Sequence, residues 1–283
     1  MNLTILDVPG LLRQYGLHPE KSLGQNFLLD ESVLSQIVET AHISPQEDVL
    51  EIGAGLGNLT RHLAICARSV VAVELDHKLI PPLIHVVGGY PNVQVVEGDI
   101  LALDPVSLVS HEDYLVVANI PYYITSALIR HLLESSLPPR RLILTVQREV
   151  ARRICALPGD MSLLALSVQV YGHPEIIFQI PASAFYPPPN VDSAVLRIDL
   201  FSDPLIPSPD LDAFFQLIKA GFSQRRKTLR NALSGGLRLP PTRVESMLIN
   251  AQIDPMRRAE TLDLTEWRKL TAIYKVELHT GIV

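Results

Sequence analysis

Over its first 200 residues the chain alternates short apolar runs with stretches of helical periodicity. The apolar runs have the length and composition of buried strands, and they lie at Val49–Ile52, Val70–Glu74, Val93–Glu97, Tyr114–Ala118, Arg141–Val146, Glu175–Ile180 and Ser193–Leu200. Helix-like stretches lie at Leu59–Cys66, Leu79–Val87, Ala127–Leu133 and Val150–Cys155, with another helix expected near Val33. Such alternation is typical of a parallel sheet with crossover helices. It predicts an α/β fold with a largely parallel, Rossmann-like sheet.

The pattern changes after residue 209, where only helices are expected. They lie at Asp210–Ala220, Gln224–Ser234, Thr242–Ala251 and Thr265–Val276. The segment FSDPLIPSP (201–209) breaks every periodic pattern. Charge changes there too, from 12 Lys/Arg against 21 Asp/Glu in residues 1–201 to 12 against 9 in residues 202–283. We therefore predict an α/β domain over 1–201 and a small all-helical domain over 202–283.

Composition excludes several classes of protein. No apolar run approaches the ~20 residues of a membrane span, and the start, MNLTILDVPG, lacks the features of a signal peptide. Cys66 and Cys155 form no disulfide framework, and scattered histidines such as His77 and His111 suggest no metal site. The net charge of −6 argues against indiscriminate binding of nucleic acid. We expect a cytoplasmic, monomeric protein that neither enters a membrane nor holds a metal.

The segment VVANIPYY (116–123) is the first candidate site. Pro121 has no amide hydrogen, so the strand before it has to end there. The side-chain oxygen of Asn119 and the carbonyl of Ile120 are then free to accept hydrogen bonds, with the ring of Tyr122 close behind. Two acceptors beside an aromatic ring suit a flat base that carries an amino group. The alternative is an ordinary turn at the end of a strand.

A glycine loop and two carboxylates form a second candidate site. GAGLG (53–57) closes the first predicted strand and opens a helix, but its spacing is not that of the dinucleotide fingerprint. Glu74 ends the second strand, where a carboxylate can accept from ribose hydroxyls, and Asp99 follows the third strand, where it can accept from an adenine amino group. Ends of neighbouring parallel strands meet at one edge of the sheet. These residues predict a nucleoside-cofactor site that fits NAD and S-adenosylmethionine equally.

Eight segments along the whole chain resemble the ribosomal RNA adenine dimethyltransferase family. They are SLGQNFLLD (22–30), the GAGLG loop, Glu74, GDI (98–100), NIPYY (119–123), AFYPPPNVDSAVLR (184–197), GFSQRRKTLRNAL (221–233) and AETLDLTEW (259–267). The most similar branch is the bacterial enzyme that makes two adjacent dimethyladenosines near the 3′ end of 16S rRNA. The resemblance implies an S-adenosylmethionine-dependent methyltransferase that acts on 16S rRNA within the small ribosomal subunit.

The resemblance also implies roles for individual residues. Contacts to S-adenosyl-L-methionine are implied at Asn26, Leu28, Gly53, Glu74, Asp99 and Asn119. The catalytic segment is Asn119, Ile120, Pro121 and Tyr122, and Phe185 is implied as a second stacking wall for the target base. Many relatives carry Asn where this chain has Tyr123, and Leu where it has Ile120. The acceptors are retained, but the outer wall of the pocket differs.

Two groups of basic residues are candidates for RNA contacts. One comprises Arg225, Arg226, Lys227 and Arg230, and the other includes Arg148 and Arg152. On a helix, Arg226 and Arg230 would share a face. The alternative for either group is a solvated surface.

Three functions remain open from the sequence. An rRNA adenine dimethyltransferase fits best. A NAD-dependent oxidoreductase is opposed by the glycine spacing and by the lack of a catalytic His or Tyr–Lys pair. A non-catalytic RNA-binding or assembly protein is opposed by the retention of every expected pocket residue.

Overall fold

The computed structural model describes residues 3–111 and 113–279. These residues form two compact units, one from residues 1–151 and 174–200 and the other from 152–173 and 201–283. Within the described ranges, no helix combines the length and apolarity needed to span a membrane.

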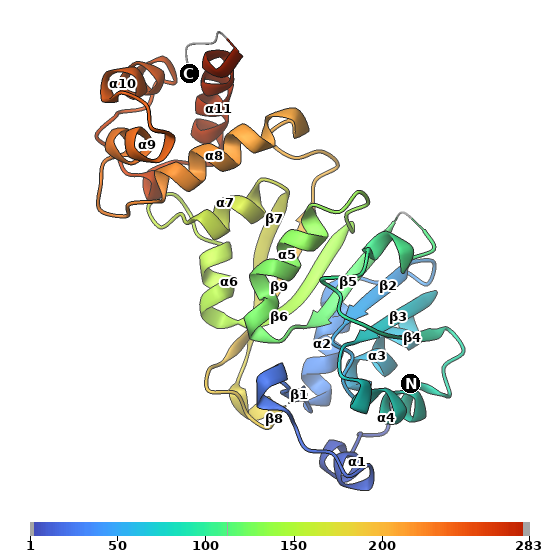
Figure 1. Ribbon diagram of the computed structural model, residues 1–283. Coiled ribbons are helices and arrows are strands. Elements are labelled where there is room, and N and C mark those ends of the chain that lie inside the picture. Colours follow the sequence, from blue (N-terminus) through green and yellow to red (C-terminus); the bar gives the residue numbers. More distant parts are fainter. Residues whose placement is uncertain (1–2, 112, 280–283) are drawn as a thin grey trace. The chain divides into compact units, whose positions relative to one another are not determined.

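A seven-stranded sheet is the centre of the first unit (Figure 1). Its strands lie in the order β4-β3-β2-β5-β6-β9-β7. Their bounds are β2 Asp48–Ile52, β3 Ser69–Glu74, β4 Val93–Glu97, β5 Tyr114–Asn119, β6 Arg141–Gln147, β7 Gly172–Ile180 and β9 Ser193–Leu200. Strands β2 to β6 pair in parallel and β9 runs antiparallel to β6. All seven predicted strands and the largely parallel sheet are confirmed.

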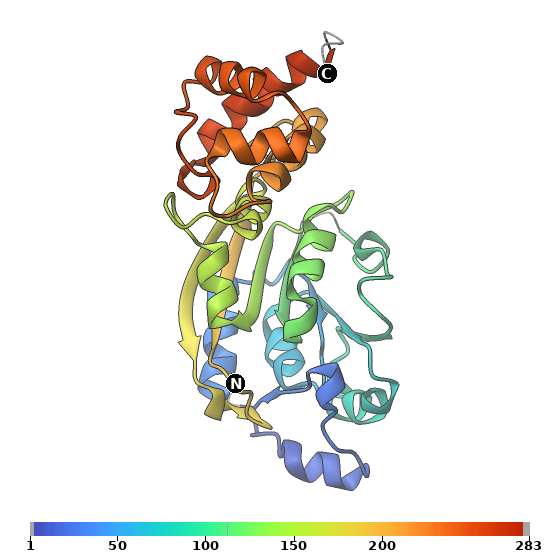
Figure 2. The ribbon, with the colours of Figure 1, turned by 60° about the vertical axis from the view of Figure 1, so that its left-hand side comes forward.

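Helices cover both faces of this sheet. Figures 1 and 2 show α2 and α3 on one face and α5 on the other. The bounds are α2 Glu31–Ala41, α3 Asn58–Cys66, α4 Ile80–Val87 and α5 Thr125–Leu133. Under α2 and α3 lies a core to which Leu34, Leu63 and Val117 contribute fully buried side chains. This packing holds the ends of the strands in fixed register.

The order of the strands determines where a ligand can bind. The chain runs outward from β2 to β3 and β4, and then returns to place β5 on the other side of β2. Ile52 of β2 and Ala118 of β5 are therefore register partners although they are far apart in sequence. A crevice forms at the carboxyl ends of strands where the direction of winding reverses. Both candidate segments, residues 53–57 and 119–123, follow these two strands.

Some short elements of the first unit were not predicted. They are the helix α1 (Val8–Gln14) and the strands β1 (Phe27–Leu28) and β8 (Phe185–Tyr186), which pair antiparallel with each other. Two-residue strands carry no periodicity that a sequence pattern could reveal.

The second unit is helical, with a core of its own. Its helices are α7 Leu163–Gln169, α8 Leu211–Gly221, α9 Leu229–Leu237, α10 Pro241–Asn250 and α11 Leu264–His279. Phe214, Leu248 and Trp267 are fully buried in its centre. The helix α6 (Arg148–Ile154) begins in the first unit and ends in the second.

This unit is larger than the predicted helical domain. It includes residues 152–173, which the boundary at residue 201 had placed in the α/β part. Leu166 of α7 packs in the same core as Phe214, and the amides of Gly159 and Met161 donate to the carbonyl of Glu260. Those contacts join residues between about 50 and about 100 positions apart in the sequence, so the local pattern could not reveal them.

The predicted helix over Gln224–Ser234 is wrong in its first part. Helix α9 begins only at Leu229, whose amide donates to the carbonyl of Arg257, while Gln224 and Lys227 close a turn. The segment SQRRK (223–227) contains no apolar residue, so a helix there would have no face to bury. Arg226 and Arg230 therefore do not share a helical face.

Candidate active site

An open cleft lies at the carboxyl ends of β2, β3, β4 and β5. Its empty space is about 840 Å³, a figure that includes the open solvent at its mouth. The predicted catalytic and cofactor residues that line it are Asn26, Gly53, Glu74, Asp99, Asn119, Ile120, Pro121, Tyr122 and Phe185. The structure thus brings together residues from six separate segments, and only Leu28 of the predicted set does not line the cleft.

The glycine loop gives the cleft its floor. Gly53 directly follows β2 and has a φ of +75°, a conformation that residues with a side chain rarely adopt. A Cβ atom at this position would lie 3.2 Å from the carbonyl oxygen of Asn119. The absence of a side chain therefore lets β2 and the end of β5 approach closely, and it leaves the backbone of residue 53 open to a ligand.

Glu74 is fixed at the end of β3 by two backbone amides. Its Oε2 accepts from the amide of Gly55 at 2.7 Å and its Oε1 accepts from the amide of Asp76 at 2.9 Å. Burial raises the pKa of this carboxyl, although the two hydrogen bonds oppose the shift. A carboxylate oxygen can accept more than one hydrogen bond, so both oxygens retain capacity toward the cleft.

Asp99 lies after β4, next to Glu74 along the edge of the sheet. The amide of Gly98 donates to the carbonyl of Glu74, and one oxygen of Asp99 accepts from the amide of Leu101. The side chain of Asp99 is exposed and lines the cleft. None of the described residues that line the cleft is a lysine or an arginine, so its wall is acidic.

Asn119 is oriented by a hydrogen bond to a distant segment. Its Nδ2 donates to the backbone carbonyl of Asn26 at 3.2 Å, and Asn26 in turn donates from its own Nδ2 to the carbonyl of Gly24. The amide orientation follows from this network. Because the nitrogen is used, the oxygen of Asn119 remains as an acceptor toward the cleft.

The next residue supplies a second acceptor. Ile120 is buried and its amide donates to the carbonyl of Thr145 on β6 at 3.3 Å. Among the described residues, no donor bonds to the carbonyl of Ile120. Pro121 follows with an extended ψ of 127° and has no amide hydrogen to offer. Two neighbouring acceptors are therefore presented at the end of β5.

Two aromatic rings stand beside these acceptors. The hydroxyl of Tyr122 bonds to Oγ of the fully buried Ser193 at 2.7 Å, which anchors the ring to β9. Burial raises the pKa of this phenol. Phe185 on β8 is 4% exposed and contributes its remaining surface to the cleft. Both rings are held by the protein before any ligand binds.

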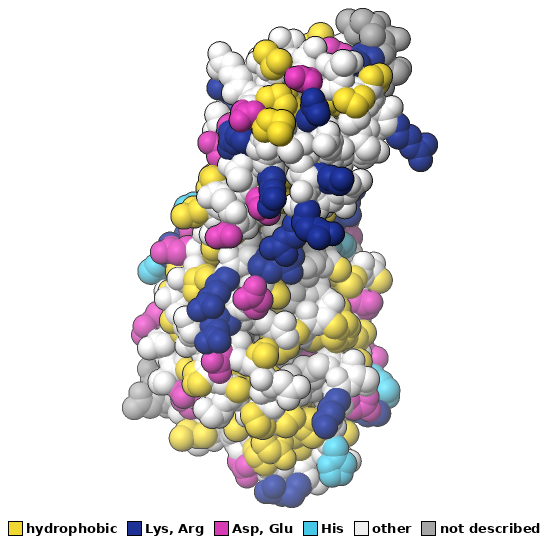
Figure 3. All heavy atoms as spheres, turned by 90° about the vertical axis from the view of Figure 1, so that its left-hand side faces the viewer, with side chains coloured by type: hydrophobic (Ala, Val, Ile, Leu, Met, Phe, Trp, Pro, Cys, Tyr) yellow, Lys and Arg dark blue, Asp and Glu magenta, His cyan; other side chains and the backbone are white. Residues whose placement is uncertain are grey.

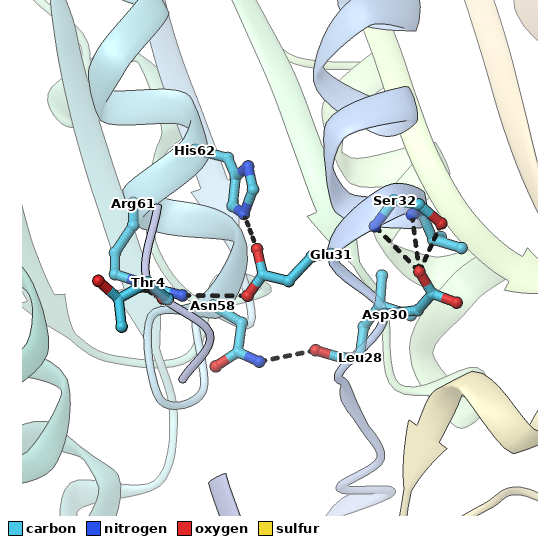
Figure 4. Close-up of polar contacts among 9 residues, drawn as sticks. Thr4, Leu28, Asp30, Glu31, Ser32, Asn58, Arg61 and His62 are labelled. Carbon is cyan, nitrogen blue, oxygen red and sulfur yellow. Dashed lines mark hydrogen bonds and ion pairs between the residues drawn. The ribbon is translucent and has the colours of Figure 1, made fainter. Parts of the chain in front are cut away.

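Leu28 supports the site from outside the cleft. Its side chain is buried in the core, and its carbonyl accepts from Nδ2 of Asn58 at 2.7 Å (Figure 4). Figure 4 also shows Glu31 of α2 pointing toward Arg61 and His62 of α3. These contacts hold the segment with Asn26 and Leu28 against the helix that follows the glycine loop.

Glu51 is a buried acid behind the cleft for which the sequence predicted no role. It lines a side cavity with Leu28, Gly53 and Asn58. Its Oε2 is buried without a hydrogen-bond partner among the described residues. Burial raises the pKa of Glu51 to about 8. The signal was a charged residue in the strand DVLEI, whose other residues are also buried.

Leu75 and Ile100 also line the cleft and were not assigned to it, while Tyr123, which the resemblance places at the outer wall of the pocket, lines it as well. Leu75 is 47% exposed although it is apolar, which is typical of a surface that a ligand covers. Each directly follows or neighbours a predicted residue, so their place in the chain was the available signal.

The predicted RNA-binding residues differ in whether their side chains are already held in ion pairs. Arg225, Arg226 and Lys227 are exposed and make no ion pair with described residues. Arg230 is paired with Glu245, and Arg148 with Asp192. Arg152 is exposed on α6. Figure 3 shows Lys and Arg side chains on the helical unit, with some acidic side chains among them.

Comparison with known proteins gives a consistent result. A family model described as "Ribosomal RNA adenine dimethylase" matches residues 17–275. The chain is 44% identical over 280 residues to a protein of Dehalococcoides mccartyi named Ribosomal RNA small subunit methyltransferase A, with 96% of each chain covered. A protein of the same name from Geobacillus kaustophilus is 42% identical over 271 residues, with 92% of each covered.

Two solved structures share the fold over most of the chain. One is a dimethyladenosine transferase from Plasmodium falciparum, with a TM-score of 0.76, 25% identity, and 89% of this chain and 98% of that one covered. The other is the 23S rRNA methyltransferase ErmE, with a TM-score of 0.71, 31% identity, and 88% and 100% covered.

Proposed function

The chain belongs to the ribosomal RNA adenine dimethylase family, and we propose that it dimethylates the 6-amino groups of two adjacent adenosines near the 3′ end of 16S rRNA in the small ribosomal subunit. It is an S-adenosyl-L-methionine-dependent rRNA methyltransferase. The cofactor supplies a methyl group made electrophilic by a sulfonium centre. We place the reaction in the cytoplasm and expect the enzyme to act as a monomer.

The choice of subunit rests on the relatives. Those named for the small subunit are 44% and 42% identical to this chain, whereas the 23S rRNA methyltransferase is 31% identical. The higher identity also extends over more of the chain, 96% and 92% against 88%. This favours a small-subunit substrate over a large-subunit one.

The residues of the cleft fit the cofactor. Gly53 leaves the backbone open at the end of β2, and the fixed carboxylate of Glu74 can accept from ribose hydroxyls. Asp99 can accept from the adenine amino group. A cationic cofactor suits an acidic wall, whereas the pyrophosphate of NAD would meet carboxylates and no lysine or arginine among the lining residues described.

One observation carries the proposed substrate: Asn119 donates through its nitrogen to Asn26 and keeps its oxygen for the cleft. With the carbonyl of Ile120, this oxygen can accept both hydrogens of an adenine amino group. Tyr122 is positioned to stack on the base. To reach these groups the adenosine has to leave its stack, which costs a few kcal/mol, and stacking on the protein offsets that cost.

These two acceptors activate a weak nucleophile. The lone pair of the adenine amino nitrogen is delocalised into the ring, so the free base reacts poorly. Hydrogen bonds to Asn119 and Ile120 favour a pyramidal nitrogen whose lone pair points at the methyl group. The nitrogen–methyl bond forms as the sulfur–methyl bond breaks, and the amino nitrogen then loses a proton to water. No histidine or lysine base is needed, because the methylated nitrogen is strongly acidic before that loss.

The second methylation makes a different demand on the same residues. A monomethylated amino group has one hydrogen left, so one of the two acceptors has no donor in the second round. An unpaired carbonyl at an open cleft can be hydrated. We therefore expect the acceptor nearer the mouth to be the one released.

We further propose that the helical unit, whose later part was expected as a domain over 202–283, binds rRNA through Arg225, Arg226 and Lys227. Their freedom from ion pairs supports this role, since a phosphate then displaces no acidic partner. Arg152 is exposed and is a further candidate, whereas Arg230 and Arg148 are weaker ones because they are already paired with Glu245 and Asp192.

Methyl transfer from labelled cofactor into undermethylated small subunits tests the function. We expect label at two adjacent adenosines near the 3′ end of the RNA, and none when the subunits are already methylated. Label in 23S rRNA would refute the choice of subunit. Binding to subunits without any transfer would support a non-catalytic assembly protein, and a tight complex with NAD would support an oxidoreductase.

A further inference from the structure

Tyr123 is an exposed aromatic residue at the mouth of the cleft. It lies in the 3₁₀ turn Tyr122–Ile124 between β5 and α5, and it lines the cleft beside Tyr122. Its side chain is 60% exposed. Residues of a 3₁₀ turn point about 120° apart, so the ring of Tyr123 faces away from the inner wall to which Tyr122 is anchored.

The ring is supported from one side. Gly24 has a φ of +64°, and a Cβ atom placed there would lie 3.2 Å from Cβ of Pro121 and 3.6 Å from Cδ1 of Tyr123. Residue 24 therefore faces an edge of the ring, with room between them for little more than a methyl group. Within the described ranges, the hydroxyl of Tyr123 makes no hydrogen bond, unlike that of Tyr122. The ring thus has residue 24 beside one edge and leaves most of its surface to solvent.

We propose that Tyr123 is a stacking platform for the nucleotide next to the target adenosine. The inference rests on the proposed function, since it requires a flipped base in the cleft. When one base enters the cleft, its neighbour loses a stacking partner at the mouth, where Tyr123 stands. For two adjacent adenosines that neighbour is itself a purine, with a large face to cover.

A tyrosine suits such a platform better than a small polar side chain would, because the latter can hydrogen-bond a base or phosphate but cannot stack. In this chain the flat ring supplies contact area with only two rotatable side-chain bonds to order. Tyr123 is therefore a residue that positions the RNA, and it takes no part in the transfer of the methyl group.

Substitutions of Tyr123 can distinguish the effect of a flat ring from the effect of an apolar side chain. Tyr123→Phe keeps the ring, Tyr123→Leu keeps an apolar side chain without a flat face, and Tyr123→Ala removes both. We expect kcat/KM for undermethylated small subunits to stay near the wild-type value for Phe, and to fall about 5- to 100-fold for Leu and Ala, the loss of one stacked base. Cofactor affinity, measured by calorimetry, should not change.

Ile84→Ala is the matched control, because Ile84 is 52% exposed on α4 and does not line the cleft. It should methylate as the wild type does. Wild-type activity of Tyr123→Ala would overturn the platform, as would a Phe variant as impaired as Ala or a parallel loss of cofactor affinity. A wild type that transfers no methyl group to adenosine would overturn the proposed function itself, and the platform with it.

Discussion

Replacing Asn119 with Ala removes one of the two acceptors for the adenine amino group. The other acceptor should persist, because the carbonyl of Ile120 is set by the chain direction at Pro121 and by the hydrogen bond from the Ile120 amide to Thr145. The change also removes the hydrogen bond from Asn119 to the carbonyl of Asn26. Its effect on methyl transfer and its effect on the fold must therefore be separated.

The expected magnitude depends on what the acceptor does. A neutral hydrogen bond that only binds the base contributes about 0.5–1.5 kcal/mol, or up to tenfold in rate. The hydrogen bond to an acceptor becomes stronger as positive charge develops on the amino nitrogen. It then acts in the transition state, as a hydrogen-bond donor does toward the negative charge in an oxyanion hole. Removing one such donor costs about 2.7–4 kcal/mol. Since the oxygen of Asn119 is pre-oriented by Asn26, we expect the larger effect, a 100- to 1000-fold loss.

Single-turnover methylation of undermethylated subunits at saturating cofactor measures this loss. Saturation matters because the family resemblance also places Asn119 at the cofactor. The matched control is Asn92→Ala, since Asn92 likewise donates from its side chain to backbone carbonyls, those of Ala64 and Ala67, and does not line the cleft. Both variants should lose stability, but only Asn119→Ala should lose transfer.

Equal rates of methylation by the two variants would refute a catalytic role for Asn119. A loss of tenfold or less at saturating cofactor would leave Asn119 as a binding contact only. A parallel loss of subunit affinity of the same size would also refute a role in the transition state, because the effect would then lie in the ground state.

Three further predictions concern the cofactor, a buried acid and the RNA. Glu74→Ala should weaken S-adenosylmethionine binding by roughly 1.5–3 kcal/mol in calorimetry, because it removes a charged acceptor for the ribose. Glu51 keeps its proton in the folded state up to a pKa of about 8 but loses it near 4.5 when unfolded, so its contribution to the free energy of unfolding falls as pH rises between these values. The free energy of unfolding in urea, taken as the difference between Glu51→Gln and wild type, should therefore favour the variant more at pH 8 than at pH 5. Replacing Arg225, Arg226 and Lys227 together with Ala should make subunit binding less dependent on salt. The slope of log K against the logarithm of the salt concentration should become shallower by about 0.7–0.9 for each phosphate that the variant no longer neutralises.

Each of these has a control in the same chain. Glu97 is the register partner of Glu74 but does not line the cleft, so Glu97→Ala should bind cofactor normally. An equal stability difference between Glu51→Gln and wild type at both pH values would contradict the raised pKa. Arg268 and Lys269 are exposed on α11. A variant with Ala at both positions tests whether the loss of positive charge elsewhere in the chain changes the salt slope in the same way. An unchanged salt slope in the triple variant would make residues 225–227 a solvated surface.

Periodicity predicted the parts of the fold in which neighbours in sequence are also neighbours in space. The seven sheet strands are each rich in apolar residues, and β4 and β9 were placed to the residue. The rule that strand ends meet at one edge then brought Gly53, Glu74 and Asp99 into one site without any knowledge of their contacts, whereas Asn119 was added to it by the resemblance. That part of the candidate site follows from the sequence alone.

Features that depend on distant contacts could not be predicted this way. The start of α9 depends on carbonyls of Pro255 and Arg257, more than 20 residues later. Residues 152–173 join the helical unit through the core around Phe214. Leu28 was placed at the cofactor by resemblance, and its buried side chain supports the site from the core while only its carbonyl reaches Asn58.

The hydrogen bond between Asn119 and Asn26 spans 93 residues and joins the two halves of the proposed chemistry. Asn26 belongs to the segment that the resemblance assigns to the cofactor, and Asn119 presents the acceptor to the base. If that segment moves away, the amide of Asn119 loses the partner that fixes its orientation, and its nitrogen can then face the base in place of its oxygen. A nitrogen there would repel the amino hydrogens that it should accept. Correct placement of residues 23–28 is therefore a condition for activating the nucleophile as well as for binding the cofactor.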